Sequence, residues 1–201
     1  ALGGAGQGKT TLMQWLTVMC GRKTFPESMK EWNDRIPFLI KLRTILDRDM
    51  PVEGEFTAIM ASELPTDNKP HKDWEIKILK EGRAVIMVDG FDEVPQERRE
   101  KVIKWLDILS KKYPNNRYIL TSRPSSYKQE FSLTDAGFEA VKLQPMTPNA
   151  MREFILHWHR AISLVLNPIN PDYLADEAEK LLDELKQKKS LRQLVTNPLL
   201  C

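Results

Sequence analysis

The sequence lacks the features that mark a secreted, metal-binding or membrane-spanning chain. Only two of its 201 residues are cysteines, Cys20 and Cys201, and their separation matches no metal-ligand spacing. No apolar run in the sequence approaches the roughly 18 residues that cross a bilayer. We therefore expect no disulfide framework, no zinc site and no membrane span. We also expect both cysteines to be small buried residues, and the location to be cytoplasmic.

An excess of charge of one sign is also missing. The chain has 30 Lys and Arg residues against 28 Asp and Glu residues, a formal net charge of +2. Basic side chains near the C-terminus, between Lys186 and Lys189, are preceded by acidic ones, which is typical of a solvated helix face. This balance argues against direct binding of nucleic acid or of an anionic membrane.

Short apolar runs alternate with helical patterns over most of the chain. Alternation of this kind predicts an α/β fold with a parallel sheet flanked by helices. The run from Ala84 to Val88 is continuously apolar, as in a central strand that is covered on both faces. The first helix is apolar on more than one face, so we expect it to be buried nearly all round and to stop at Gly21. Strands are expected at 36–42, 84–88, 118–121 and 138–143, and helices at 9–20, 55–64, 71–81 and 95–112.

The pattern changes after Pro145, where the strand signals end. Helices are expected at 148–166, 171–188 and 190–196. We therefore expect an α/β domain over residues 1–145 and a small all-α subdomain over residues 146–201. The chain begins two residues before Gly3 and stops on an apolar run, so we expect a fragment in which the first strand and the helical subdomain are truncated.

Residues 3 to 10 fit the phosphate-loop pattern G-x-x-x-x-G-K-[ST] at every fixed position. Glycines allow the backbone to wrap around phosphate oxygens, and the helix that starts near Lys9 adds its positive end. Lys9 is expected to reach the β- and γ-phosphates, the Thr10 hydroxyl to ligate Mg²⁺, and Thr11 to lie near the α-phosphate. The alternative, a flexible glycine loop before a helix, is disfavoured because the helix follows directly. The expected phosphate contacts are Gly3, Gly4, Ala5, Gly6, Gln7, Gly8, Lys9, Thr10 and Thr11.

Three acidic residues follow the apolar strand at 84–88. Asp89 comes at its end, where a carboxylate can hold Mg²⁺, and Asp92 and Glu93 lie a turn further, where either could polarise the attacking water. The alternative is an acidic turn that caps the next helix. Arg123 follows the strand at 118–121, at the sheet edge where ligands bind in such folds, and could sense the γ-phosphate or the acidic cluster. A surface arginine paired with an acid is the alternative for Arg123.

With these residues the chain resembles the NACHT family of STAND-class NTPases. The resemblance rests on five segments in order: GGAGQGKTTL, EGRAVIMVDGFDEV, YILTSRP, LQPMTPNAMREFI and TNPLL. It implies a molecular switch in which ADP holds a closed monomer and exchange for ATP drives oligomerisation, with roles in innate immunity or defence against phage. It also implies that Asp89 handles Mg²⁺, Asp92 and Glu93 serve hydrolysis, Arg123 reads the γ-phosphate, and Pro198 packs near the adenine.

Other functions remain open at this point. A P-loop enzyme with a small-molecule acceptor, such as a kinase, would need an acceptor pocket and usually a lid. A scaffold could bind nucleotide only to stabilise itself. The preference for adenine over guanine rests on the resemblance, because no guanine-reading N-K-x-D motif is evident. The partners implied are ATP or ADP with Mg²⁺, further copies of the full-length protein, and effector and sensor domains outside this chain.

Overall fold

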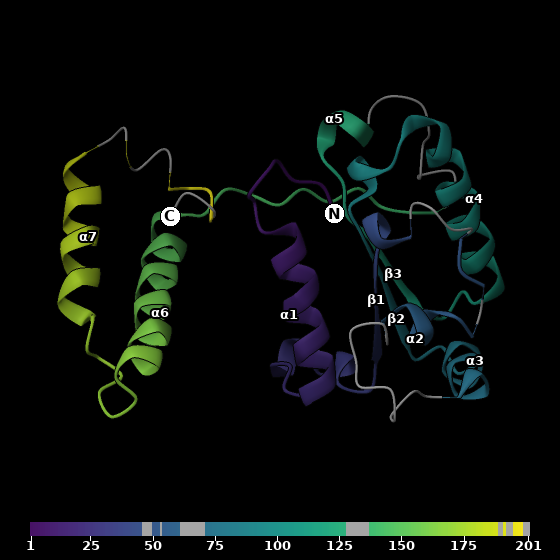
Figure 1. The fold of residues 1–201 in the computed structure, drawn as a ribbon, viewed down its shortest axis with the longest axis horizontal. Helices are drawn as coiled ribbons and strands as arrows, with labels where there is room; N and C mark the ends of the chain where they lie inside the picture. Colours follow the sequence, from purple (N-terminus) through teal and green to yellow (C-terminus); the bar gives the residue numbers. More distant parts are fainter. Residues whose placement is uncertain are drawn as a thin grey trace. The chain divides into compact units, whose positions relative to one another are not determined.

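The computed structural model describes residues 1–45, 50–52, 54–60, 71–127, 137–188, 191 and 195–198. Two compact units make up the chain. The first contains Ala1–Gly4 and Lys9–Lys142, and the second contains Ala5–Gly8 and Leu143–Cys201 (Figure 1). None of the described helices is long and apolar enough to cross a membrane.

A parallel sheet, with three strands among the described residues, forms the centre of the first unit. Its strands are β1 (Ile36–Lys41), β2 (Ala84–Asp89) and β3 (Arg117–Leu120), in the order β1-β2-β3. All three lie where the apolar runs predicted them. Leu2 forms isolated parallel bridges with Ser122, just beyond β3, and with Lys142. The chain before the phosphate loop therefore lies next to the end of β3, and β3 separates it from β2.

The strand predicted for 138–143 is wrong. In the described part of this segment only Lys142 pairs, through its single bridge to Leu2. Residues 139–142 are exposed, and no strand in the described part of the chain extends the pairing. An apolar pattern alone does not make a strand without a ladder of backbone partners.

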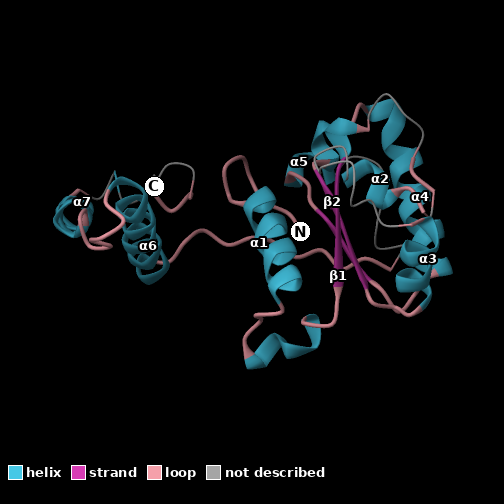
Figure 2. Cartoon of the chain, turned by 60° about the horizontal axis from the view of Figure 1, so that its bottom comes forward, coloured by secondary structure: helices cyan, strands magenta, loops and turns pink. Residues whose placement is uncertain are grey.

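Helices cover both faces of this sheet. Successive side chains of β2 point to opposite faces of the sheet. Val85 and Met87 pack with α1 (Lys9–Arg22), whereas Ile86 and Val88 pack in the larger core on the other face. Figure 2 shows α1 on one side of the sheet and α2 (Phe56–Met60), α3 (Lys72–Lys80) and α4 (Gln96–Lys112) on the opposite side. β2 is buried from Ala84 to Val88, as the continuous apolar run predicted.

Short helical turns connect these elements. They are the 3-10 turns η1 (Glu27–Trp32), η2 (Leu42–Thr44) and η5 (Phe91–Glu93) and the short helix α5 (Pro124–Tyr127). The helices predicted at 71–81 and 95–112 form as α3 and α4. The helix predicted at 55–64 forms over 56–60; residue 55 precedes it, and residues 61–64 lie outside the described part of the chain.

The prediction of an almost fully buried first helix is wrong. Met13, Leu16 and Cys20 are buried on one face of α1, but Trp15 is 43% exposed and Val18 is 46% exposed. The helix also continues through Gly21 to Arg22. Its apolar residues therefore form one packed stripe and one exposed face. Cys20 is 2% exposed, as predicted for a small core residue, whereas Cys201 lies outside the described residues.

In its described residues, the second unit has the long helices α6 (Pro148–Leu166) and α7 (Ala175–Gln187). The Thr147 hydroxyl accepts a hydrogen bond from the Ala150 amide at 3.2 Å, and Pro148 occupies the first turn, so α6 begins where the sequence predicted. Of the short helix predicted at 190–196, only 191, 195 and 196 are described. The core of this unit consists of Met151, Ile155, Ala178, Leu182, Leu185 and Val195.

Candidate nucleotide site

The phosphate loop has backbone angles that select glycine. Gly6 has φ of +73° and Gly8 has φ of +82°, both in the left-handed region that disfavours side chains with a Cβ. The loop connects Leu2, which forms the β-bridges, to the first turn of α1, and this helix begins at Lys9. A glycine-rich turn leading directly into a helix is the arrangement that binds phosphate groups.

The Lys9 ammonium group lies over the start of the loop. Its Nζ donates to the carbonyl oxygens of Gly3 at 2.7 Å and Gly4 at 3.0 Å. An ammonium held by neutral carbonyls can exchange them for phosphate oxygens, because a charged acceptor makes the stronger hydrogen bond. Thr11, the next residue but one, is exposed on α1.

A hydrogen bond joins the phosphate-loop helix to the acidic strand end. The Thr10 hydroxyl donates to Oδ2 of Asp89 at 2.8 Å, across 79 residues of sequence. The structure thus brings together the two residues predicted to hold Mg²⁺. A hydroxyl and a carboxylate are hard oxygen ligands, and Mg²⁺ characteristically uses one or two carboxylates together with phosphate oxygens. The donor set therefore fits Mg²⁺ bound with a nucleotide. No group of three His, Cys, Asp or Glu residues that could hold a metal without phosphate occurs among the described residues.

Thr121 holds the other oxygen of the Asp89 carboxylate. Its hydroxyl donates to Oδ1 of Asp89 at 2.5 Å and accepts from the Gly90 amide at 3.0 Å. The sequence places Thr121 at the end of the strand predicted at 118–121 but predicts no role for it. The available signal was its position, because β2 and β3 are parallel and pair Val88 with Leu120, which puts Asp89 beside Thr121.

Asp92 and Arg123 form a close ion pair. The Arg123 Nε lies 2.9 Å from Oδ2 of Asp92, and the Arg123 amide donates to Oδ1 at 3.1 Å. The Asp92 side chain is only 10% exposed, whereas that of Arg123 is 55% exposed. Both carboxylate oxygens of Asp92 are thus engaged by one residue, and the arginine pairs with an acid of the cluster while keeping an exposed guanidinium.

Glu93 is exposed and lies over the turn that follows Asp89. Gly90 has φ of +90°, and a Cβ placed there would lie 3.3 Å from both Cδ and Oε2 of Glu93. A side chain at position 90 would therefore be strained by the backbone angle and would press on the Glu93 carboxylate. Glycine at this position lets the chain turn sharply and keeps Glu93 close to the strand end.

Pro198 lies beside the phosphate loop within the second unit. A Cβ placed on Gly8 would be 3.9 Å from Cγ of Pro198, and the neighbouring Asn197 donates from Nδ2 to the Ala5 carbonyl at 2.9 Å. The helix-break segment near the end of the chain is therefore attached to the loop residues Ala5 and Gly8. Its predicted role beside the adenine stays a prediction.

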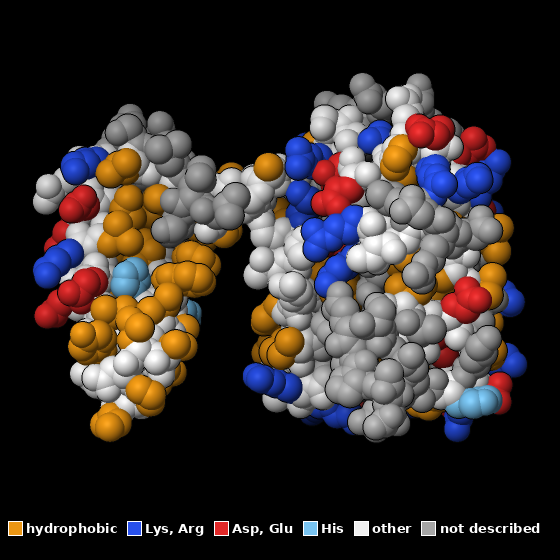
Figure 3. Space-filling view, viewed as in Figure 1, with side chains coloured by type: hydrophobic (Ala, Val, Ile, Leu, Met, Phe, Trp, Pro, Cys, Tyr) orange, Lys and Arg blue, Asp and Glu red, His pale blue; other side chains and the backbone are white. Residues whose placement is uncertain are grey.

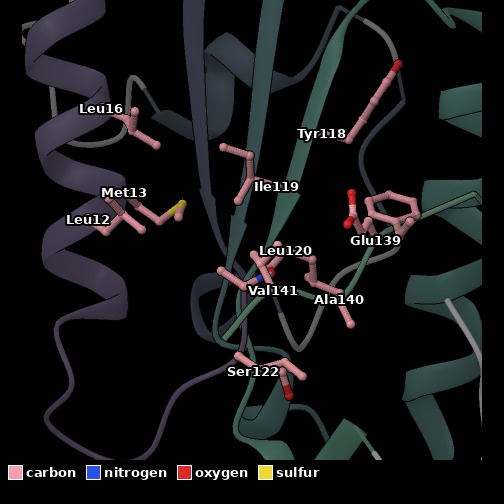
Figure 4. A pocket seen from close by; sticks show the side chains of 13 residues that line it. Leu12, Met13, Leu16, Tyr118, Ile119, Leu120, Ser122, Glu139, Ala140 and Val141 are labelled. Atoms are coloured by element: carbon pink, nitrogen blue, oxygen red, sulfur yellow. The ribbon is translucent and has the colours of Figure 1, made fainter. Parts of the chain in front are cut away.

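An apolar cavity of about 260 Å³ lies apart from these polar groups. It opens between α1 and the edge of β3, and Leu12, Leu16, Leu120 and Val141 are among the residues that line it (Figure 4). Of the predicted site residues, none lines it. The cavity is therefore distinct from the phosphate-binding arrangement.

The phosphate loop, its lysine and threonine, and the carboxylate at the end of the neighbouring buried strand define a P-loop NTPase. A comparison with family models agrees, since a model of the NACHT domain matches residues 1–162. The chain therefore belongs to the NACHT family, and it is a nucleotide-binding NTPase module. None of the curated proteins compared with the chain matches it.

Proposed function

We propose that this module is the ATP/ADP switch of a STAND-type signalling or immune-defence protein, in which slow ATP hydrolysis is coupled to oligomerisation. Membership of the NACHT family supports the proposal. The observation that carries the nucleotide chemistry is the 2.8 Å hydrogen bond between Thr10 and Asp89. This bond joins the residue that follows the phosphate-binding lysine to the acidic strand end, as Mg²⁺-dependent phosphate binding requires.

In this proposal the loop backbone and Lys9 hold the phosphates. Lys9 leaves the carbonyl oxygens of Gly3 and Gly4 for the β- and γ-phosphate oxygens, which offer a full negative charge. Thr10 and Asp89 would hold Mg²⁺, which would supply positive charge to the β- and γ-phosphates. Thr11 lies near the α-phosphate, and Pro198 packs near the adenine.

The two remaining acids have different roles in this proposal. Asp92 has both carboxylate oxygens engaged by Arg123, so it orients the arginine. Glu93 is exposed beside the strand end, so it polarises the water that attacks the γ-phosphorus. In that step the new O–P bond forms as the bond between the γ-phosphorus and the β–γ bridging oxygen breaks, and the water proton leaves toward Glu93.

Arg123 reads the γ-phosphate in this proposal. Asp92 uses its Nε, and a guanidinium carries four further N–H donors on its two terminal nitrogens. The exposed part of the side chain can therefore contact a phosphate while its Nε stays with Asp92. An arginine that touches only the third phosphate distinguishes ATP from ADP, which a switch requires.

The first test is Lys9→Ala in the full-length protein, with Lys101→Ala on α4 as a matched control. Calorimetry should show at least a tenfold loss of ATP and ADP affinity for Lys9→Ala and none for Lys101→Ala, because only Lys9 reaches phosphate. Size-exclusion chromatography should show ATP-dependent oligomers for the control variant alone. Unchanged binding and assembly in Lys9→Ala would refute the switch. ATP consumption that depends on an added acceptor would indicate a kinase-like enzyme, and binding without turnover or assembly would indicate a scaffold.

The second test separates Glu93 from Asp92. Glu93→Gln should lower the ATP turnover rate about 10²-fold with ATP affinity kept, as expected for loss of a general base. Asp92→Asn should instead reduce the preference for ATP over ADP, because Arg123 loses its charged partner. Equal losses of turnover in the two variants, with the ATP preference kept, would contradict this division of roles.

A further inference from the structure

Thr121 is a fully buried hydroxyl residue in the polar part of the first unit. Its side chain is 0% exposed, at the position just after β3. Its backbone is also fixed, since its amide donates to the Val88 carbonyl at 2.9 Å and its carbonyl accepts from Phe91 at 3.0 Å. Four hydrogen bonds through backbone and side chain therefore hold this residue against the end of β2.

The direction of the Thr121 hydroxyl proton follows from its partners. A hydroxyl has one proton to donate and two lone pairs to accept. The Gly90 amide can only donate, so the bond at 3.0 Å uses a lone pair of Oγ1. The proton of Thr121 is then directed to Oδ1 of Asp89, 2.5 Å away. This hydrogen bond from the buried side restricts rotation of the Asp89 carboxylate.

The two oxygens of the Asp89 carboxylate are consequently assigned to different neighbours. Oδ1 is occupied by the buried hydroxyl of Thr121, and Oδ2 faces the exposed hydroxyl of Thr10 at 2.8 Å. A cation that takes Thr10 as a ligand therefore meets Oδ2 already oriented. Groups that orient a metal ligand in this way commonly change metal affinity or activity by 10- to 100-fold when they are removed.

We propose that Thr121 is a positioning residue for Mg²⁺, acting through Asp89 and the Gly90 turn. The proposal rests on the proposed Mg²⁺–nucleotide function of the Thr10–Asp89 pair. Thr121 touches neither the cation nor the nucleotide, and its contribution is to keep Oδ2 presented toward Thr10. The residue is specific to Mg²⁺-dependent binding, so nucleotide binding in the absence of the cation does not depend on it.

The test compares Thr121→Val, which keeps the side-chain shape and removes the hydroxyl, with Thr121→Ser, which keeps the hydroxyl. Binding of a fluorescent ADP analogue is titrated with Mg²⁺ and repeated in EDTA. Thr121→Val should require about tenfold more Mg²⁺ for half-maximal enhancement of binding. Its affinity in EDTA should stay within about twofold of the unmodified protein, and Thr121→Ser should restore the Mg²⁺ dependence.

Ser122→Ala is the matched control, because Ser122 is buried beside Thr121 but its hydroxyl donates only to the Arg123 carbonyl at 3.1 Å. It should leave the Mg²⁺ dependence unchanged. Hydrogen exchange without nucleotide gives a second readout, since Thr121→Val should speed exchange of the Gly90 amide about tenfold. If Thr121→Val does not fold, Thr121→Cys keeps a weak donor and should show an intermediate Mg²⁺ shift of about threefold.

Unchanged Mg²⁺ dependence in Thr121→Val or Thr121→Cys would overturn the positioning role. An equal loss of binding in EDTA would also overturn it, since the residue would then act only on the fold. Failure of the proposed function looks different, because the unmodified protein itself would then show no Mg²⁺-enhanced binding of ADP.

Discussion

The two units of the chain keep their structure by different means. The first unit buries β2 on both faces and satisfies its strand-end polar groups through Thr10, Thr121 and Arg123. The second unit has a small core supplied mainly by α6 and α7. Apolar side chains stay exposed on it (Figure 3), including Val165 at 80% and Ile169 at 95%.

This difference determines which unit can hold catalytic and metal-binding side chains in a set geometry. Side chains that hold a metal or water must keep their geometry, so they need a rigid element behind them. Asp89 has such support, because it ends a strand that is buried from Ala84 to Val88. A pair of helices with few buried residues opens more readily. We expect the catalytic groups to depend on the first unit and the second unit to be the part that changes most readily.

The largest expected effect is the loss of stability when a core side chain of the first unit is truncated, measured against an equivalent truncation in the second unit. Ile86→Ala in β2 should lower the free energy of unfolding by about 4 kcal/mol, because Ile86 is fully buried in a tightly packed core. Leu182→Ala in α7, where the residue is 6% exposed, should cost about 2 kcal/mol because the small core can relax around it. Urea denaturation followed by circular dichroism and tryptophan fluorescence would measure both.

The spectroscopic part of that experiment can separate the units. Trp158 lies on α6, whereas Trp15 and Trp105 belong to the first unit. A phenylalanine variant of Trp158 therefore identifies the fluorescence change that belongs to the helices. Equal costs for the two alanine variants, with one coincident transition, would show that the units unfold together and would break the comparison.

Hydrogen exchange should show the next largest effect. Amides of β2 are expected to exchange only on global unfolding, whereas those of α6 and α7 should exchange through local opening. We expect opening of the helical unit to require about 3 kcal/mol less free energy than opening of β2. Mass spectrometry of peptides covering 84–89 and 175–187 would measure it. Similar protection of the two peptides would contradict the comparison.

Much of this architecture could be predicted because local pattern and tertiary environment agree. The continuous apolar run at 84–88 needed burial on both faces and obtained it in β2. The start of α6 follows from a capping threonine and a first-turn proline, which are local signals. The phosphate loop is recognisable from its residue pattern, and the backbone angles of Gly6 and Gly8 require glycine.

The errors and omissions concern features that depend on distant parts of the chain. A strand at 138–143 required a ladder of partners, and among the described residues Leu2 alone pairs with it. The exposed face of α1 could not be separated from its buried face by apolarity alone. The roles of Thr121 and Asp92 depend on the register of β2 against β3. This register brings Thr121 to Asp89 and Arg123 to Asp92, residues more than 30 positions apart in the sequence.

Glu75 offers a smaller test of the first unit's polar interior. Its carboxylate is fully buried and accepts from the amides of Gly54 at 2.6 Å and Thr57 at 2.9 Å, at the start of α2. In Glu75→Gln the side-chain NH₂ group faces backbone amides that also donate. The substitution should therefore lower the free energy of unfolding by about 2 kcal/mol. Glu100→Gln on α4, where the side chain is 53% exposed, is the control and should cost under about 0.5 kcal/mol. Equal effects in urea denaturation would show that Glu75 does not stabilise the unit.

The smallest effect should appear at high pH through Tyr118. Burial raises the pKa of the Tyr118 hydroxyl to about 12, and this hydroxyl donates to the Leu109 and Tyr113 carbonyls. An unfolded tyrosine ionises near pH 10, so between about pH 10 and 12 the unfolded chain binds fewer protons than the folded one. The stability that this group contributes is therefore complete below pH 10 and is lost as the pH rises toward 12.

Tyr118→Phe isolates this contribution from the titration of lysines, which both proteins share. At pH 8 the variant should be about 1 kcal/mol less stable than the unmodified protein, because its ring leaves two carbonyls without the hydroxyl. Between pH 10 and 12 this difference should shrink by about 1 kcal/mol, a value kept small because Tyr118 is only partly buried. Denaturation at a series of pH values measures it. A constant difference from pH 8 to 12 would mean that Tyr118 ionises alike in the folded and unfolded chains, and that burial at this edge of the first unit is weaker than in β2.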